Sequence, residues 1–268
     1  MIYKELIDIA VRAAKKGGEE ILRIYNSNDF GVESKADDSP LTQADKNCHL
    51  SIMDSLATTN LPILSEEGVA IPYEERKDWE LFWLVDPLDG TKEFIKRNGE
   101  FTVNVALIKE NTPVGGVIYV PITDEMYFAS EDFGSYKVSD YSNTQNLSID
   151  DLMVVGNKLP IQSNYENRKH TVVGSRSHMS KETQEYVNEI KRQKPEVEIL
   201  SKGSSLKLCM IAEGLADSYP RYAPTMEWDT GAGHAIAKLA GFSVTQYNSK
   251  NEVEYNKEDL LNPWFLVK

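Results

Sequence analysis

An apolar run followed by two acids constrains the fold more than any other feature of this chain. The run Leu81–Val85 is short, rich in aromatic and branched residues and bounded by turn residues, which predicts a buried strand rather than a helix. Asp86 and Asp89 follow directly. Pro87 fixes φ and should stop the strand, and Gly90 allows a sharp turn. We therefore expect two carboxylates close together where a buried strand ends.

Carboxylates held at the end of a buried strand repel each other unless a cation or a shared proton relieves the repulsion. Hard divalent ions such as Mg²⁺ take oxygen ligands, usually carboxylates, waters and a substrate phosphate. The turn therefore predicts half of a metal site. The alternative is an ordinary Asp-rich turn, because Asp, Pro and Gly are common turn formers.

A second pair of acids also stands where an apolar run stops. A short strand is predicted at Pro62–Leu64, and the segment Ser65–Gly68 that follows it contains Glu66. If this strand neighbours the one before Asp86, Glu66 joins the same cluster. A solvated acidic turn is the alternative.

Two more acids open predicted helices. Asp45 lies three residues after Thr42, a spacing typical of a capping box, in which both side chains satisfy free backbone donors. Asp229 begins the predicted helix 227–239, where a carboxylate is favoured by the free N–H groups and the macrodipole. Capping alone would explain both residues. Small residues after Asp229 would also let a ligand approach the helix N-terminus closely.

Composition narrows the class of protein. The chain has 268 residues, 41% of them hydrophobic and 26% charged, with a net charge of −13. The acidic balance argues against binding nucleic-acid polymers, whereas a few local cations can still hold a small phosphate. The candidate cations directly after the acidic turn are Lys92, Lys96 and Arg97. Two distant cysteines, Cys48 and Cys209, are expected to be buried thiols in a reducing compartment.

No apolar run approaches the roughly 18 residues of a membrane helix, and we see no secretory signal at the N-terminus. Helical spacing predicts a helix over residues 2–25, where Gly17 and Gly18 indicate close packing or a bend, and a second helix over 42–56. Further strands are expected at 101–108, 114–120, 126–129, 136–138, 171–173, 197–200, 216–219, 242–245 and 264–267, and further helices at 92–97, 181–192 and 204–214.

The strands from 101 to 138 predict an antiparallel meander, and a polar stretch near 140–146 marks a plausible boundary. We therefore expect an N-terminal α+β domain, 1–140, with the metal-binding motifs, and a C-terminal α/β domain, 141–268. The expected fold is a layered α/β–α+β sandwich, with an antiparallel sheet in the first half and a mixed sheet in the second.

Four segments together resemble a known family. Asp86–Thr91, Ser65–Gly68 and Trp228–Asp229 match the signature motifs of the inositol monophosphatase superfamily, and Ser39–Asp45 matches a fourth family segment. These are Mg²⁺-dependent, lithium-sensitive phosphatases with a fold shared with fructose bisphosphatases. The continuation Asp89–Phe101 resembles the 3'(2'),5'-bisphosphate nucleotidase branch (CysQ type). The resemblance covers essentially the whole chain.

The resemblance implies a role for each motif residue. Two or three Mg²⁺ ions would be held by Glu66, Asp86, the carbonyl of Leu88, Asp89 and Asp229. Asp45 and Thr91 would orient and deprotonate the attacking water, and the substrate phosphate would lie on the Gly90 and Thr91 N–H groups. Two ions can activate a water and stabilise the departing oxygen. No covalent nucleophile stands out in the sequence, and His234 is expected to be a helix residue near the site rather than a ligand.

The resemblance also implies a nucleotide pocket beside the metal centre. Strand-end loops that face helix N-termini are favoured anion sites; the alternatives are helix capping for Ser204 and Ser205 and ordinary surface polarity for His178, Lys207 and Arg221. The substrate-binding residues implied are Glu66, Leu88, Asp89, Gly90, Thr91, Ser177, His178, Gly203, Ser204, Lys207, Arg221 and Asp229.

The expected activity is hydrolysis of 3'-phosphoadenosine 5'-phosphate to AMP and phosphate, which would clear a by-product of sulfate assimilation in the cytoplasm. The rivals are a phosphatase for inositol or sugar phosphates and a regulator that binds metal and nucleotide without turnover. The presence of Asp45 and Thr91 disfavours the regulator. The sequence leaves open the oligomeric state and weak peripheral association with the inner face of the cell membrane.

Overall fold

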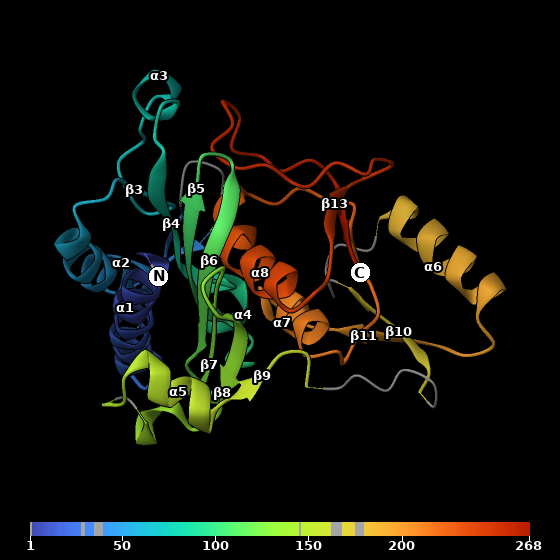
Figure 1. The fold of residues 1–268 in the computed structure, drawn as a ribbon, viewed down its shortest axis with the longest axis horizontal. Helices are drawn as coiled ribbons and strands as arrows, with labels where there is room; N and C mark the ends of the chain where they lie inside the picture. The colour runs from blue at the N-terminus through green and yellow to red at the C-terminus, as the bar shows by residue number, and fades with distance from the viewer. Residues whose placement is uncertain (1, 28–29, 35–39, 145, 162–167, 175–179) are drawn as a thin grey trace.

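The computed structural model describes residues 2–27, 30–34, 40–144, 146–161, 168–174 and 180–268. Its helices and sheets stack in layers (Figure 1). Helices α1 (Ile2–Tyr25) and α2 (Gln43–Leu56) cover one face of a seven-stranded sheet, and α8 (Glu227–Leu239) with α7 (Leu206–Ala212) covers the other. Smaller sheets follow, and α6 (Lys181–Gln193) lies outermost. The expected layered sandwich is confirmed.

The large sheet has the strand order β3-β4-β5-β6-β7-β8-β9. All neighbouring pairs are antiparallel except β3 and β4, which run parallel. The predicted meander is therefore correct, with one parallel strand added at its edge. The strands are β3 (Ile63–Ser65), β4 (Leu81–Asp89), β5 (Thr102–Lys109), β6 (Thr112–Val120), β7 (Glu125–Ser130), β8 (Gly134–Val138) and β9 (Asn157–Lys158).

Strand β4 is buried on both faces, as its apolar run predicts. Alternate side chains of a strand point to opposite faces. Trp83 and Val85 accordingly lie in the core beneath α1 and α2, whereas Phe82 and Leu84 lie in the core beneath α7 and α8. The strand carrying Asp86 is thus fixed from both sides.

The prediction that Pro87 ends this strand is wrong. Strand β4 continues to Asp89, and its pairing with β5 shifts register between Asp86 and Asp89. A bulge of this kind leaves a residue outside the ladder, so a proline is tolerated there although it has no N–H to donate. The bulge places both acids on one strand end.

The second half carries strands β10 (His170–Gly174) and β11 (Val197–Ser201), which pair in parallel, and an antiparallel sheet of order β12-β14-β13. A parallel bridge from Val172 to Ser218 joins the two, which gives the expected mixed sheet. The strand predicted at 216–219 lies slightly later in the chain. The bounds are β12 (Tyr219–Arg221), β13 (Val244–Gln246) and β14 (Phe265–Val267).

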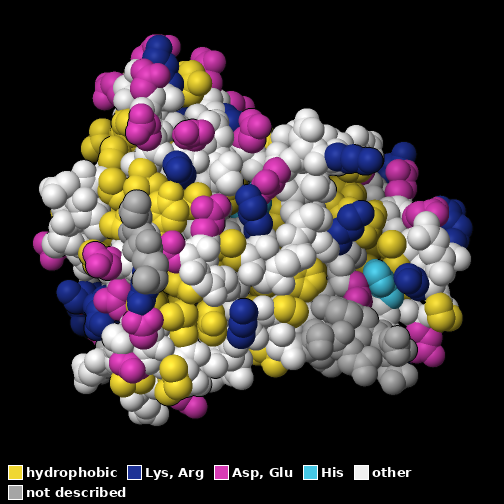
Figure 2. Space-filling model, in the orientation of Figure 1, with side chains coloured by type: hydrophobic (Ala, Val, Ile, Leu, Met, Phe, Trp, Pro, Cys, Tyr) yellow, Lys and Arg dark blue, Asp and Glu magenta, His cyan; other side chains and the backbone are white. Residues whose placement is uncertain are grey.

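The remaining elements are short. They are β1 (Glu33–Ser34), β2 (Pro40–Leu41), η1 (Ala57–Thr59), α3 (Tyr73–Arg76), α4 (Thr91–Ile95), η2 (Tyr141–Asn143) and α5 (Ile149–Val155). Within the described residues, no helix combines the length and apolarity needed to cross a membrane. On the face drawn in Figure 2, acidic and basic side chains are interspersed, and acidic ones gather over α3. Strand β9 extends the large sheet beyond residue 140, and the division into two domains stays a prediction.

The glycine pair in α1 makes a close helix contact rather than a bend. A Cβ at Gly17 would lie 2.7 Å from Cys48 Sγ, and one at Gly18 would lie 2.4 Å from the Tyr119 ring. Cys48 in turn donates through its thiol to the carbonyl of Pro87 at 3.0 Å. Contact between α1 and α2 therefore extends to the end of β4, which carries the acids.

Gly17→Ala should lower the free energy of unfolding by about 1–3 kcal/mol, because an added methyl overpacks the contact with Cys48. Thermal unfolding measures the loss. The double variant with Cys48→Ala should recover part of it, since the smaller side chain vacates the space. A single variant as stable as the parent protein would contradict the close contact.

Candidate metal centre and substrate pocket

Three carboxylates from distant parts of the chain meet at the end of the large sheet. Glu66, Asp86 and Asp229 each offer an oxygen, and these oxygens all lie within 4.8 Å of one another. Parallel pairing of β3 with β4 brings Glu66 beside Asp86, and the Glu66 N–H donates to the Val85 carbonyl at 3.1 Å. The third acid comes from the first turn of α8. The predicted convergence of these three acids is confirmed.

Helix α8 reaches the sheet closely because it carries small residues. A Cβ at Gly116 of β6 would lie 2.5 Å from the Ala232 carbonyl, and a Cβ at Gly231 would lie 3.0 Å from Leu84. No larger side chain fits between the helix and the sheet at these points. The close approach places Asp229 within reach of β4.

Burial and the mutual repulsion of the acids raise the pKa values of Asp86 and Asp229. Burial raises the pKa of Asp86 well above its ordinary value, and the charges of Glu66, Asp89 and Asp229 add to the shift. Burial and the charge of Asp89 raise the pKa of Asp229 to about 6. A divalent cation would relieve this repulsion, and three carboxylates form the oxygen-rich donor set that hard cations prefer.

Asp229 also caps its own helix. Its Oδ2 accepts from the Met226 N–H at 2.9 Å and from the Thr225 hydroxyl at 2.5 Å. The capping interpretation and the metal interpretation are therefore compatible, because the carboxylate has two oxygens and several acceptor positions.

Asp45 combines two contacts in the same way. Its Oδ2 accepts from the N–H and hydroxyl of Thr42, at 2.7 and 2.6 Å, which forms the predicted capping box of α2. Its Oδ1 accepts from the Thr91 hydroxyl at 3.2 Å. The Thr91 hydroxyl also lies 3.3 Å from the Leu88 carbonyl. Asp45 and Thr91 are thus joined beside the acidic turn, as the resemblance implies.

The turn between β4 and α4 is held by short local contacts. The Leu88 N–H donates to Asp86 Oδ1 at 3.1 Å. Gly90 has φ 95°, which favours glycine, and a Cβ there would lie 3.0 Å from the Glu100 carbonyl. Gly90 directly precedes the first turn of α4. The first N–H groups of a helix have no partner within the helix, so those of this turn can donate to a ligand.

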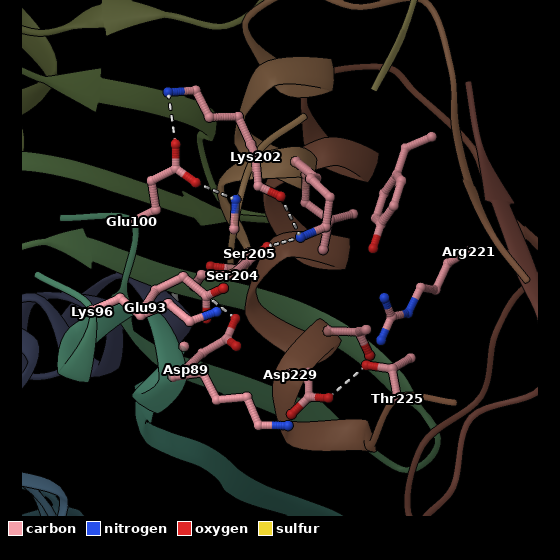
Figure 3. Close-up of a pocket in the computed structure, with 17 residues that line it drawn as sticks. Asp89, Glu93, Lys96, Glu100, Lys202, Ser204, Ser205, Arg221, Thr225 and Asp229 are labelled. Atoms are coloured by element: carbon pink, nitrogen blue, oxygen red, sulfur yellow. Dashed lines mark hydrogen bonds and ion pairs between the residues drawn. The ribbon is translucent and has the colours of Figure 1, made fainter. Parts of the chain in front are cut away.

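Asp89 lies beside the three-carboxylate group without being one of its members. Its Oδ2 accepts from the Ser204 hydroxyl at 2.8 Å and from the Asn104 amide at 3.4 Å. Together with Asp229 it forms one wall of a pocket (Figure 3). Asp89 therefore connects the acidic centre to that pocket.

The pocket opens between the acidic turn and the loop before α7. Its walls combine acids with several cations, so it can surround an anion while facing a metal centre. Arg97 is not among them, contrary to expectation, because its guanidinium stacks on Tyr25 and Phe30 and donates to the Ser27 carbonyl. The lining residues are Asp89, Gly90, Lys92, Glu93, Lys96, Glu100, Lys202, Gly203, Ser204, Ser205, Lys207, Leu208, Tyr219, Arg221, Thr225, Asp229 and Thr230.

The predicted pocket residues on the loop before α7 reach this cavity. Ser204 and Ser205 make no side-chain cap on α7, so the capping alternative is wrong for them. Lys207 is buried rather than a surface residue, and its Nζ donates to the carbonyls of Lys202 and Ser204 at 3.2 and 2.5 Å. Burial lowers the Lys207 pKa to about 8.

Arg221 follows Pro220 on β12 and lines the pocket, as expected, while donating to the Pro224 carbonyl at 2.6 Å. Ser177 and His178 lie outside the described residues. His234 is buried in α8. Its Nδ1 lies 3.0 Å from the Tyr255 hydroxyl and its Nε2 lies 2.8 Å from Glu252 Oε1, and it does not belong to the three-carboxylate group. Cys48 and Cys209 are buried free thiols, as predicted.

Sequence reasoning missed Thr102, Asn104 and Glu100. The first two lie on β5 and read as ordinary polar residues in a strand, yet they contact the loop before α7 or Asp89. Glu100 accepts from the Gly203 N–H at 2.8 Å. No local pattern marks these contacts, because they join separate elements: Asn104 lies 15 positions from Asp89, and the contacts of Thr102 and Glu100 with the loop span more than a hundred.

The sequence matches the inositol monophosphatase family over residues 2–265. It is 42% identical over 265 residues to the 3'(2'),5'-bisphosphate nucleotidase CysQ of Escherichia coli (strain K12), covering 98% of this chain and 99% of that protein. The crystal structure of CysQ from Bacteroides thetaiotaomicron superimposes with a TM-score of 0.90 at 47% identity, over 99% of this chain and 97% of that one.

More distant relatives share the fold alone. The inositol monophosphatase from Anabaena (Nostoc) sp. PCC 7120 superimposes with a TM-score of 0.69 at 23% identity, over 100% of this chain and 92% of that one. The family match and the close relatives both span nearly the whole chain. The protein therefore belongs to the inositol monophosphatase family.

Proposed function

We propose that this protein is a Mg²⁺-dependent 3'(2'),5'-bisphosphate nucleotidase that hydrolyses 3'-phosphoadenosine 5'-phosphate to AMP and phosphate. The observation that carries the proposal is the acidic group Glu66, Asp86 and Asp229 beside a pocket with several cations. A substrate with two phosphates suits this arrangement, because one phosphate can face the metal centre and the other the basic wall. The CysQ relatives add support.

Glu66, Asp86, Asp89, Asp229 and the Leu88 carbonyl would hold the ions. When bound, Mg²⁺ would neutralise the phosphate, lower the pKa of a water and stabilise the leaving oxygen. Thr91 lies within hydrogen-bond distance of Asp45, so the pair can orient a water and take up its proton. The Gly90 and Thr91 N–H groups would hold the phosphate, and the leaving group would be the 3'-hydroxyl of AMP.

The pocket side would select the nucleotide. Ser204, Lys207 and Arg221 line the same cavity as Asp229 and offer hydroxyl, ammonium and guanidinium donors. Such donors suit the second phosphate of the substrate. We further propose that the activity removes the by-product of sulfate assimilation in the cytoplasm and is inhibited by lithium.

Phosphate release from 3'-phosphoadenosine 5'-phosphate should exceed release from inositol 1-phosphate by at least about 100-fold in kcat/KM, because the basic wall gains contacts only with the bisphosphate. Both substrates are compared at equal Mg²⁺ concentration. A reversed preference would instead support an inositol phosphatase, and nucleotide binding without released phosphate would support a regulator.

Submillimolar lithium should inhibit the release of phosphate from 3'-phosphoadenosine 5'-phosphate.

Asp86→Asn should lower kcat by about 10³-fold or more while the protein stays folded, because metal-centre electrostatics supply most of the stabilisation in phosphoryl transfer. Phosphate release and circular dichroism measure the two effects. The metal-free variant should be at least as stable as the parent protein, since Asn cannot repel Glu66. Turnover that survives the substitution would contradict the metal role.

Metal-free protein should gain more thermal stability from Mg²⁺ at pH 7.5 than at pH 5. The folded-state pKa of Asp229 is raised to about 6 from an ordinary 3.8, so the charged form destabilises the fold and the penalty grows as pH rises through that window. Mg²⁺ relieves the penalty where the carboxyl is ionised. Melting curves with Mg²⁺ and with EDTA provide the measurement. Equal gains at both pH values would count against a repelling acidic centre.

A further inference from the structure

A network of neutral side chains holds Asp89, a proposed metal ligand that lies outside the three-carboxylate group. Asp89 Oδ2 accepts from the Ser204 hydroxyl at 2.8 Å and from the Asn104 amide at 3.4 Å. Asn104 lies on β5, and Ser204 lies in the loop before α7. One carboxylate oxygen therefore receives donors from both halves of the chain.

The orientation of Asn104 is fixed by the hydroxyl groups around it. Its Oδ1 lies 2.9 Å from the Thr102 hydroxyl and 2.9 Å from the Ser205 hydroxyl, and the Ser205 hydroxyl donates to it. An amide has one carbonyl oxygen and one NH₂ group. Because the oxygen faces the two hydroxyls, the NH₂ group faces Asp89.

The hydroxyl protons are directed toward Asp89. Ser204 has one hydroxyl proton and donates it to the carboxylate, so Thr102 must be the donor in its 2.6 Å contact with Ser204. Ser205 Oγ lies 2.8 Å from the Thr102 oxygen, and its one proton is donated to the Asn104 carbonyl oxygen. Thr102, Asn104 and Ser205 are all buried, and a buried network of this kind is stable only when its members are paired.

The same contacts hold the pocket loop in an unusual conformation. Ser204 has φ 53°, a left-handed value that non-glycine residues seldom adopt. The Gly203 N–H is held by Glu100 at 2.8 Å. The position of the loop thus depends on Asp89, Thr102 and Glu100 at once (Figure 3 shows the contacts of Asp89 and Glu100).

We propose that Thr102 and Asn104 are positioning residues that couple the ion held by Asp89 to the pocket loop Gly203–Ser205. The inference rests on the metal role of Asp89 in the proposed function. An ion that fixes Asp89 also fixes Ser204, and an ordered loop presents a better oriented carboxylate, since coupling between two sites is reciprocal. The hydrogen bonds of the network described above reach Asp89, so we expect the effect to be largest on the ion that Asp89 holds.

Thr102→Val tests the coupling, because valine keeps the shape and removes the hydroxyl. Mn²⁺ is titrated into metal-free protein, and free Mn²⁺ is followed by electron paramagnetic resonance. The parent protein should show two classes of site. The variant should bind the weaker class about tenfold less tightly, a typical effect of losing an outer-shell partner of a metal ligand, and the tighter class within about twofold of the parent.

Two further variants separate positioning from general damage. Thr102→Ser keeps a hydroxyl and should restore Mn²⁺ binding. Ser204→Gly removes the hydroxyl at a position whose φ suits glycine, and it should weaken the same class of site from the loop side. The matched control is Thr171→Val on β10, where a buried threonine hydroxyl donates to the Lys169 carbonyl at 3.2 Å; it should leave both classes unchanged.

Mn²⁺ binding that is unchanged in Thr102→Val overturns the proposal. Equal weakening of both classes, or a parent protein with a single class, also overturns it. The result does not depend on the substrate: if the variants change Mn²⁺ binding as expected but the parent protein releases no phosphate from the bisphosphate, the nucleotidase assignment is refuted and the coupling is supported.

Discussion

Repulsion between one buried carboxylate, Asp86, and two half-buried ones is the constraint around which the structure is arranged. Glu66 and Asp86 are held side by side by parallel strands, and Asp229 is brought to them by a helix that lies close to the sheet. Each contact that brings an acid nearer raises the electrostatic free energy of the metal-free fold. The two cores on either face of β4 offset that penalty, because they fix the strand through alternating apolar side chains.

The carboxylates to which we assign a chemical role also stabilise the fold. Asp45 caps α2 through one oxygen and reaches Thr91 through the other, while Asp229 caps α8 from within the acidic centre. Capping and function looked like competing interpretations in the sequence. In the structure one side chain can do both, because a carboxylate has more acceptor positions than a helix end uses. The capping bonds thereby fix the direction of the second carboxylate oxygen.

Much of the acidic centre could be predicted from the sequence, because its residues lie in short motifs at the ends of strands and helices. The apolar run before Asp86 and the small residues after Asp229 carry strong local signals. The continuation of β4 through Pro87 could not be predicted, because it depends on a bulge in the pairing with β5. The Asn104–Asp89 and Ser204–Asp89 contacts were missed for another reason: strand periodicity says which face a side chain occupies, but not what lies opposite it.

The distance in sequence between β4 and α8 has a consequence for the growing polypeptide. Phe82, Leu84 and Ile118 belong to the core that α7 and α8 complete, so the apolar face of the sheet has no cover until residues beyond 227 have left the ribosome. A nascent chain with such a surface is prone to aggregation. This protein should consequently depend on translation speed and chaperone protection more than its final stability would suggest.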